Sequence, residues 1–233
     1  MARLLKGLTD AARTPVRRAS AGHDNGSPGR RTQVVYLSAA WCLSYPTEEI
    51  IGRVGMMRAA LAEFPRAVTP FEPVLTALEG TELGVLQSQY VQEFDLSKRH
   101  SLHLSYWTDG DTRRRGDVLA GFKQAYRQCD VLVDTQGELP DYLPMVLEFA
   151  ATVDLASGRE LLVRFRPSLE MLRLALVDAA LPQAGVLAAL CDTLPGESPA
   201  DRNAVMTMAG YGPPTESVGL EPYDPRLLPM RGV

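Results

Sequence analysis

The stretch ELPDYLPMVLEFAATVD at residues 138–154 decides the fold. Its apolar side chains recur at helical spacing and form one stripe along a helix: Tyr142, Val146, Phe149 and Val153. Asp141 is expected to cap the N-terminus of this helix, and Pro144 falls in the first turn, where its missing N–H has no intrahelical partner. The stretch therefore predicts a helix whose N-terminal loop is stiffened by two prolines and carries two carboxylates.

Similar stripes extend outward from this helix in both directions. They predict helices that begin near residues 32, 47 and 69, the second of which runs toward Phe64–Pro65, and others over 83–94, 118–126, 159–165, 168–181, 182–194 and 199–209. Leu and Ala, which lose little side-chain freedom in a helix, number 32 and 26 against 2 Ile. Residues 101–106 alternate like a strand, but an isolated strand cannot satisfy its own backbone, so we expect an irregular or helical connector. The expected fold is all-α, a single compact domain of about eight short helices.

The two ends of the chain depart from this pattern. Residues 1–31 carry seven Lys or Arg against two Asp and end in a Gly- and Ser-rich stretch that cannot bury enough apolar surface to order itself. We expect a disordered basic tail there. Five prolines among the 23 residues 211–233 predict a flexible or extended proline-rich C-terminal tail. The helical domain is therefore expected over residues 32–210.

The charge and the cysteines exclude several classes of protein. Of 24 Lys and Arg and 28 Asp and Glu in the chain, 17 and 26 lie beyond the tail, so the body has a net charge of −9. A body this acidic repels phosphates, which argues against a nucleic-acid partner and favours a protein or a cationic segment. Three cysteines without C-x-x-C spacing indicate neither a disulfide framework nor a zinc site, and favour a reducing compartment. No apolar run approaches the roughly 20 residues that span a bilayer.

Signatures of catalysis and cofactor binding are absent from the sequence. It contains no G-x-x-x-x-G-K-[ST] phosphate loop, no dinucleotide-binding G-x-G-x-x-G and no G-x-S-x-G nucleophile elbow. His100 and His103 could offer two metal ligands, but no nearby Cys or H-E-x-x-H motif accompanies them. We therefore expect a protein that is not an enzyme and that holds no cofactor or metal.

Two polar segments break local rules. The run DTRRRG at 111–116 places three arginines in the first turn of an expected helix, where the helix dipole disfavours each cation by roughly 0.3–1 kcal/mol. Exposed ion pairs with Asp111 and Asp117 need only two of them. At least one arginine is therefore expected to reach elsewhere, either to Asp95 or Glu138 within the fold or to a carboxylate of a partner. The stiff loop at 138–144 is either a structural brace or a rigid docking edge for a cationic peptide.

Four motifs in order resemble one known family. They are Tyr90-x-x-x-Phe94-Asp95, Ser101-Leu-x-Leu104, Gly110-Asp-x-Arg113-x-Arg115-Gly116 and Glu138-Leu-Pro-Asp141-x-Leu-Pro144-x-x-Leu147-Glu148. Together they resemble the NarJ-type nitrate reductase assembly chaperones, within the broader TorD-like group of molybdoenzyme chaperones. The resemblance extends over residues 34–154.

The resemblance implies a TorD-like, all-helical, cytoplasmic chaperone that is not a subunit of the finished enzyme. Members of the family bind the apo catalytic subunit of respiratory nitrate reductase, hold it competent for molybdenum cofactor insertion and delay its attachment to the membrane anchor. The implied partner is that subunit, bound through an N-terminal amphipathic segment. The chaperone itself is expected to be a monomer or a weak homodimer.

The motifs also supply the residues expected to contact the partner: Tyr90, Asp95, Asp111, Arg113, Arg115, Glu138, Leu139, Pro140, Asp141, Leu143, Pro144 and Glu148. Two alternatives stay open. One is a chaperone for a dimethyl sulfoxide or N-oxide reductase, although the Gly-Asp-x-Arg-x-Arg-Gly run favours the nitrate branch. The other, from a different class, is a small helical hydrolase or nucleotide-binding regulator.

Overall fold

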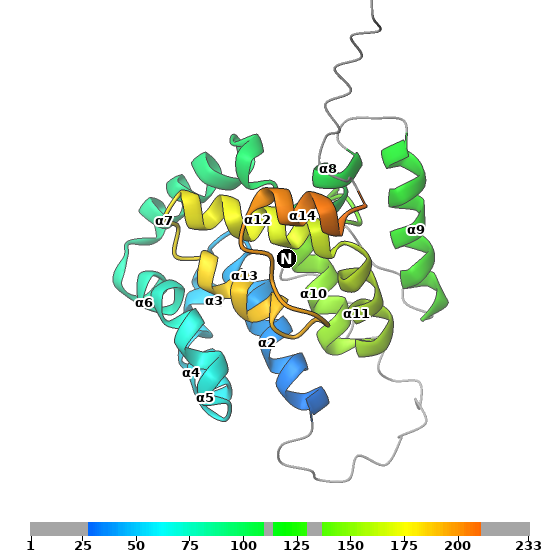
Figure 1. The fold of residues 1–233 in the computed structure, drawn as a ribbon. Helices are drawn as coiled ribbons and strands as arrows, with labels where there is room; N and C mark the ends of the chain where they lie inside the picture. The colour runs from blue at the N-terminus through cyan, green and yellow to red at the C-terminus, as the bar shows by residue number, and fades with distance from the viewer. Residues whose placement is uncertain (1–27, 110–113, 130–136, 211–233) are drawn as a thin grey trace, which may run out of the picture.

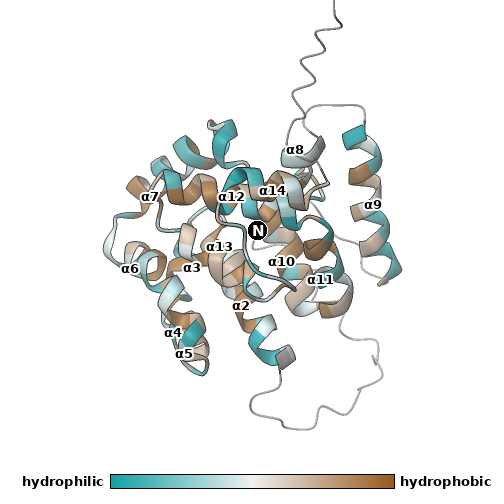
Figure 2. Ribbon diagram, viewed as in Figure 1, coloured by the Kyte–Doolittle hydropathy of each residue, from teal (hydrophilic) through white to brown (hydrophobic). Residues whose placement is uncertain are grey.

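The predicted core helix is α10 (Leu143–Thr152), which packs along α2 (Pro28–Cys42) in the centre of the protein (Figure 1). The computed structural model describes residues 28–109, 114–129 and 137–210. Eight of the ten residues of α10 are buried, because the helix is covered by α2 and by α11 (Leu155–Arg164). Figure 2 shows the resulting concentration of hydrophobic residues in the central helices, whereas α9 (Arg114–Gln128) at the edge carries more hydrophilic positions.

The described residues are helical apart from connecting loops and one isolated bridge, and they confirm the predicted all-α fold. They divide into more helices than the eight or so that were expected. The other α-helices are α3 (Glu48–Gly52), α4 (Val54–Ala62), α5 (Pro65–Val68), α6 (Glu72–Gly80), α7 (Leu83–Tyr90), α8 (Leu104–Asp109), α12 (Arg166–Asp178), α13 (Ala184–Cys191) and α14 (Arg202–Met208). Three short turns complete them: η1 (Thr69–Phe71), the π-helical η2 (Val91–Asp95) and η3 (Lys98–His100).

The extra helices arise mostly between residues 47 and 71, where longer helices were expected. Arg53 separates α3 from α4, with ψ of −7°. Phe64 leaves the helical conformation altogether, with ψ of 81°, because a residue that precedes proline disfavours the α region. Pro65 then opens α5, where its missing N–H costs nothing. The sequence predicted a helix from residue 47 toward Phe64–Pro65, so the break at Phe64 is confirmed, whereas the break at Arg53 was not predicted.

Two glycines allow helices to approach closely. A Cβ atom on Gly158 of α11 would lie 2.3 Å from the Cβ of Ala150 on α10, so only glycine fits between these two helices. A Cβ atom on Gly185 of α13 would lie 2.1 Å from the carbonyl oxygen of Pro70 in η1. These contacts fix α11 and α13 against the elements beside them.

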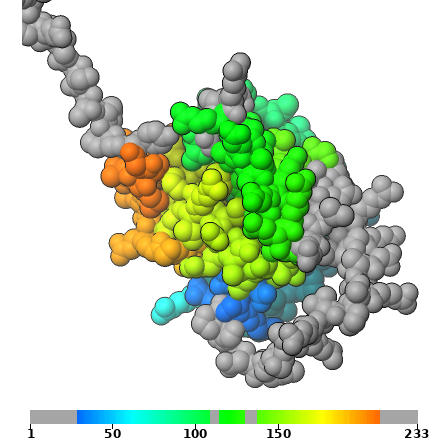
Figure 3. Space-filling view, turned by 90° about the vertical axis from the view of Figure 1, so that its right-hand side faces the viewer, coloured from blue at the N-terminus to red at the C-terminus, as the bar shows by residue number. Residues whose placement is uncertain are grey.

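Helix α9 covers one side of the bundle through aromatic residues. The ring of Phe122 stacks on that of Phe165 at a centroid distance of 4.8 Å, and Tyr126 meets Phe149 edge-on at the same distance. Figure 3 shows α9 running down this face beside the later helices. The remaining positions of α9 are largely exposed, as its amphipathic stripe predicts.

The alternating segment at residues 101–106 is the irregular and helical connector that was expected, but it also forms a backbone link. The N–H of Leu104 donates to the carbonyl of Asp141 at 3.1 Å, and the N–H of Leu143 donates to the carbonyl of Leu102 at 2.8 Å. His103 and Tyr142 thereby form an antiparallel bridge. The connector is therefore held against the N-terminal loop of α10.

Asp141 does not cap α10, in contrast to the expectation. The N-cap of α10 is Tyr142, which makes no side-chain capping bond. The Asp141 carboxylate faces α8 instead, because the bridge places it beside the first turn of that helix, where it accepts the backbone N–H of Ser105 at 2.9 Å. Pro144 does lie in the first turn of α10, as predicted.

The ends of the described chain differ from expectation only at one point. Helix α2 begins at Pro28 rather than at Thr32, and Arg30 in its first turn pairs with Glu63 at 2.9 Å. The rest of the expected basic tail, residues 1–27, and the proline-rich stretch 211–233 lie outside the described residues. None of the helices in the described ranges combines the length and apolar character needed to cross a membrane.

Candidate functional site

Two tyrosines from separate sequence motifs meet at the centre of the candidate site. The hydroxyl oxygens of Tyr90, the last residue of α7, and Tyr142 lie 2.8 Å apart, and the Tyr90 hydroxyl also donates to the carbonyl of Leu43 at 3.2 Å. Both rings are buried. Burial raises the pKa of both phenols well above the usual value, and the carboxylates of Asp95 and Glu138 raise it further. Three residues that the sequence singled out, Tyr90, Asp95 and Glu138, thus interact electrostatically in the fold.

The surface around this tyrosine pair is acidic and partly apolar. We call Asp95, Glu138, Leu139 and Tyr45 the acidic edge. Both carboxylates are exposed, while Leu139 and Tyr45 expose 37% and 38% of their surfaces. The ring of Tyr45 meets that of Tyr90 edge-on at 5.4 Å. An edge of this composition complements a segment that carries both cationic and apolar side chains.

Besides Tyr90, four of the residues expected to contact a partner are buried instead: Pro140, Asp141, Leu143 and Pro144. Asp141 and Leu143 have no exposed surface, so neither side chain can touch a partner in this conformation. The carbonyl of Pro140 accepts a hydrogen bond from the Tyr126 hydroxyl at 2.7 Å, which ties the loop to α9. The loop at 138–144 is therefore a structural brace along most of its length, with Glu138 and Leu139 at its exposed end.

Beneath the edge, a buried polar network connects three helices. Asp141 accepts from the Ser105 hydroxyl at 2.5 Å, and that hydroxyl also accepts from Nε of Arg115 at 3.1 Å. Nδ1 of His103 lies 3.4 Å from the other carboxylate oxygen of Asp141. Burial alone would raise the pKa of Asp141, but the imidazole and the bonds from Ser105 outweigh it, so the pKa falls below its ordinary value. Asp141 therefore carries a charge that braces α8, α9 and the start of α10.

Of the two arginines of the 111–116 run that the structure describes, Arg115 reaches across the fold, and it donates to the Ser105 hydroxyl, which was not among the acceptors that the sequence predicted. Asp111 and Arg113, the other two expected site residues of this run, lie outside the described residues. Their predicted role in partner contact stays a prediction.

Glu148 lies apart from the acidic edge. It lines a separate hollow of about 530 Å³ together with Trp41, Arg53 and Gln87. The guanidinium of Arg53 lies 4.7 Å from the centre of the Trp41 ring and also pairs with Glu49. Burial raises the pKa of Glu148, and the charge of Arg53 partly offsets this. The motif Glu138 to Glu148 thus contributes to two different surfaces.

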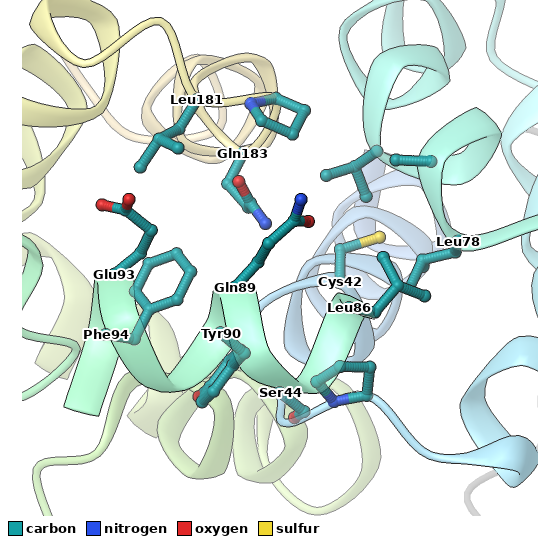
Figure 4. A pocket seen from close by; sticks show the side chains of 14 residues that line it. Cys42, Ser44, Leu78, Leu86, Gln89, Tyr90, Glu93, Phe94, Leu181 and Gln183 are labelled. Atoms are coloured by element: carbon teal, nitrogen blue, oxygen red, sulfur yellow. The ribbon is translucent and has the colours of Figure 1, made fainter. Parts of the chain in front are cut away.

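A pocket on the other side of α7 was not predicted. It has a volume of about 260 Å³, and apolar side chains form most of its wall (Figure 4). Tyr90 and Phe94 line it, so it adjoins the acidic edge. Its other residues come from distant parts of the chain, from α2 at Cys42 to the turn at Leu181–Gln183. No local motif connects these positions, and sequence reasoning had no signal that would join them.

No group of three or more His, Cys, Asp or Glu side chains within the described residues is arranged to hold a metal ion.

The chain was compared with protein families, individual proteins and solved structures. The family model described as nitrate reductase delta subunit matches residues 57–174, which include the acidic edge except for Tyr45. Over 160 residues the chain is 41% identical to the nitrate reductase-like protein NarX of Mycobacterium tuberculosis. That match covers 69% of this chain and 24% of NarX, so the chain spans about a quarter of the length of that relative.

Shorter relatives match along more of their own length. The probable nitrate reductase molybdenum cofactor assembly chaperone NarJ of Bacillus subtilis is 30% identical over 145 residues, which cover 57% of this chain and 73% of NarJ. NarJ of Escherichia coli is 30% identical over 113 residues, with coverage of 48% and 43%. The crystal structure of a putative redox enzyme maturation protein from Archaeoglobus fulgidus superimposes with a TM-score of 0.52 at 18% identity. It covers 75% of this chain and 98% of that protein, which shows that the two share a fold.

Proposed function

The chain belongs to the nitrate reductase delta subunit family, and from this premise we propose that it is a dedicated assembly chaperone of nitrate reductase. In this proposal it binds the apo catalytic subunit, enables insertion of the molybdenum cofactor and times the attachment of that subunit to the membrane. The names of the relatives in Bacillus subtilis and Escherichia coli, both molybdenum cofactor assembly chaperones, support it. The proposed place of action is the cytoplasm, with the chaperone as a monomer or weak homodimer.

The observation that carries the proposal is the acidic edge within the family match. Asp95 and Glu138 come from motifs more than forty residues apart in the sequence, yet the charge of each raises the pKa of the same two phenols, Tyr90 and Tyr142. Two exposed carboxylates beside apolar surface suit an amphipathic segment with basic residues. In the proposal this segment lies at the N-terminus of the catalytic subunit.

The proposed mechanism is to hold a conformation. A binder that prefers the open apo form of its client stabilises that form in proportion to the preference. Cofactor insertion closes the client, weakens binding and releases the chaperone. Such a mechanism needs differential affinity but no catalytic group and no bound cofactor on the chaperone.

Paired measurements test this proposal. The catalytic subunit is produced with and without this chain in a host that lacks its own chaperone, and its molybdenum content and nitrate-reducing activity are measured. We expect both to fall strongly without the chain. Calorimetry with purified proteins should then give at least tenfold tighter binding to the apo subunit than to the loaded subunit. Equal molybdenum loading in both preparations, or equal affinity for both forms, would contradict the proposal.

A further inference from the structure

The pocket beside α7 has one wall that is held rigidly in place. Helix α12 ends in a Schellman motif, in which Ala180 N–H donates to Val177 and Leu181 N–H donates to Leu176, both at 3.0 Å. Ala180 has a φ of +51°, the left-handed conformation that this motif requires. The turn projects Leu181 and Gln183 over the pocket (Figure 4). The pocket is therefore preformed on this side.

The opposite wall belongs to α7 and η2. Leu86, Tyr90 and Phe94 supply apolar surface there, and all three belong to the buried hydrophobic core. Tyr90 also connects the pocket to the acidic edge, because its ring lines the pocket while its hydroxyl meets Tyr142 beside Asp95 and Glu138. A ligand that occupies the acidic edge thus has an apolar pocket directly next to it.

One polar atom of the pocket is a buried acceptor without a donor. The Oε1 atom of Gln183 is buried and has no hydrogen-bond partner among the described residues. The carboxamides of Gln89 and Gln183 point toward one another across the pocket (Figure 4). Glu93 adds a carboxylate at the rim, where it also lies 3.1 Å from Nδ1 of His100. Since an unpaired buried acceptor is costly, a donor brought by a ligand would improve the energy of this site.

We propose that this pocket binds one large apolar side chain of the amphipathic client segment. In the same complex, a backbone N–H of that segment donates a hydrogen bond to the carboxamide oxygen of Gln183. The volume of about 260 Å³ is below the range of roughly 300–1,000 Å³ that drug-sized ligands occupy, and fits a single side chain better. The basic residues of the same segment would lie on Asp95 and Glu138. The inference rests on the proposed function. It adds that one apolar side chain, held in the pocket, fixes how the client segment is aligned along the chaperone.

Matched variants test the pocket. Ala77 on α6 lines it, and Ala77→Leu would fill the space with a side chain that favours the helix. Gln183→Met removes the acceptor with little change in size, whereas Gln183→Glu keeps an acceptor at the same position. Ala120→Leu, an exposed substitution on the distant α9, is the control for added apolar bulk. Thermal unfolding of each variant checks that the fold is intact.

The probe is a synthetic peptide of the N-terminal segment of the nitrate reductase catalytic subunit, with binding measured by calorimetry. Ala77→Leu should weaken binding about tenfold or more, the effect of losing one buried apolar side chain. Gln183→Met should weaken it about threefold to tenfold, as expected for one hydrogen bond. The affinities of Gln183→Glu and Ala120→Leu for the peptide should be no weaker than about half that of the unchanged protein.

A photo-crosslinking amino acid at Gln89 gives an independent readout. Mass spectrometry of the crosslinked peptide should identify a Leu, Ile, Phe, Met or Trp as the attached residue or its direct neighbour. If the unchanged protein binds the peptide but Ala77→Leu and Gln183→Met bind equally well, the pocket inference is wrong and the proposed function stands. If the unchanged protein binds neither peptide nor apo subunit, both are wrong.

Discussion

The carboxylate of Asp141 accepts both the backbone N–H and the hydroxyl of Ser105, a residue 36 positions earlier in the chain. The first bond satisfies a donor in the first turn of α8, and the second directs the hydroxyl hydrogen to Asp141, so that the hydroxyl oxygen can accept from Nε of Arg115. One buried charge thereby joins the connector at 101–106, the start of α9 and the loop before α10. This contact is central to the stability of the face that carries the acidic edge.

Replacement of Asp141 by Asn should destabilise the protein. Asn keeps one oxygen acceptor but loses the charge and places an NH₂ group against Ser105 or His103. We expect the free energy of unfolding to fall by about 2–3 kcal/mol, the usual effect of disrupting buried hydrogen bonds to a charged group. Urea unfolding measures it. Glu138→Gln, an exposed neighbour in the same loop, should change stability by less than about 0.5 kcal/mol, and a similar loss in both variants would contradict this assignment.

The stability of the protein should fall in acid because of the same residue. The folded-state pKa of Asp141 lies below its ordinary value of 3.8, so the unfolded chain binds the proton more readily than the folded protein. Its contribution is therefore complete above the pKa of the unfolded state and is lost as the pH falls through the folded pKa. The free energy of unfolding measured from pH 6 to pH 2 should fall less steeply for Asp141→Asn than for the unchanged protein. Parallel curves would show that Asp141 does not carry this charge.

Gly158→Ala should be strongly destabilising. The added Cβ would meet Ala150 at 2.3 Å, so α10 and α11 would have to separate in the centre of the core. We expect a loss of about 1–3 kcal/mol or more, as for other overpacked cores. Gly55→Ala is the matched control, because nothing lies within 4 Å of its Cβ position in α4. That variant should gain about 0.5–1 kcal/mol, and thermal unfolding distinguishes the two signs.

Ala180→Gly should stabilise the protein. Ala180 adopts a φ of +51°, a left-handed conformation that costs an L-residue roughly 1–2 kcal/mol and glycine almost nothing. The greater freedom of glycine in the unfolded chain offsets part of this gain. We expect a net increase of about 0.5–1 kcal/mol in the free energy of unfolding, measured by urea titration. A decrease would show that the turn before Leu181 is not strained by alanine.

Neutralising the acidic edge should weaken client binding without affecting the fold. The double variant Asp95→Asn, Glu138→Gln removes two exposed charges, and affinity for the N-terminal client peptide should fall about threefold to tenfold in low salt. The difference should shrink as salt is added, because exposed charges are screened. Glu160→Gln on α11, which lies outside both the edge and the pocket, should leave affinity unchanged. Unchanged affinity of the double variant in low salt would place the client's basic residues elsewhere.

The helices could largely be predicted because their cause is local. A stripe such as Tyr142, Val146 and Phe149 places apolar side chains on one face of a helix, and burial of that face is favourable whichever neighbour covers it. The same pattern could not predict the break at Arg53, which depends on a single backbone conformation, whereas Pro65 did predict the end of a helix at Phe64. The motifs containing Asp95 and Glu138 could be singled out, but not shown to converge.

The sequence by itself determined the all-α class, a helix with an apolar stripe from Tyr142 to Val153 and the presence of polar motifs outside the apolar stripes, because periodicity and composition act over neighbouring residues. Only the tertiary structure decided which helix Asp141 caps, which carboxylates reach the surface and that Cys42, Leu86 and Gln183 share a pocket. The physical reason is that a polar side chain takes its partner from whatever segment packs against it. That segment is set by the contacts of the whole chain, here by the bridge between His103 and Tyr142.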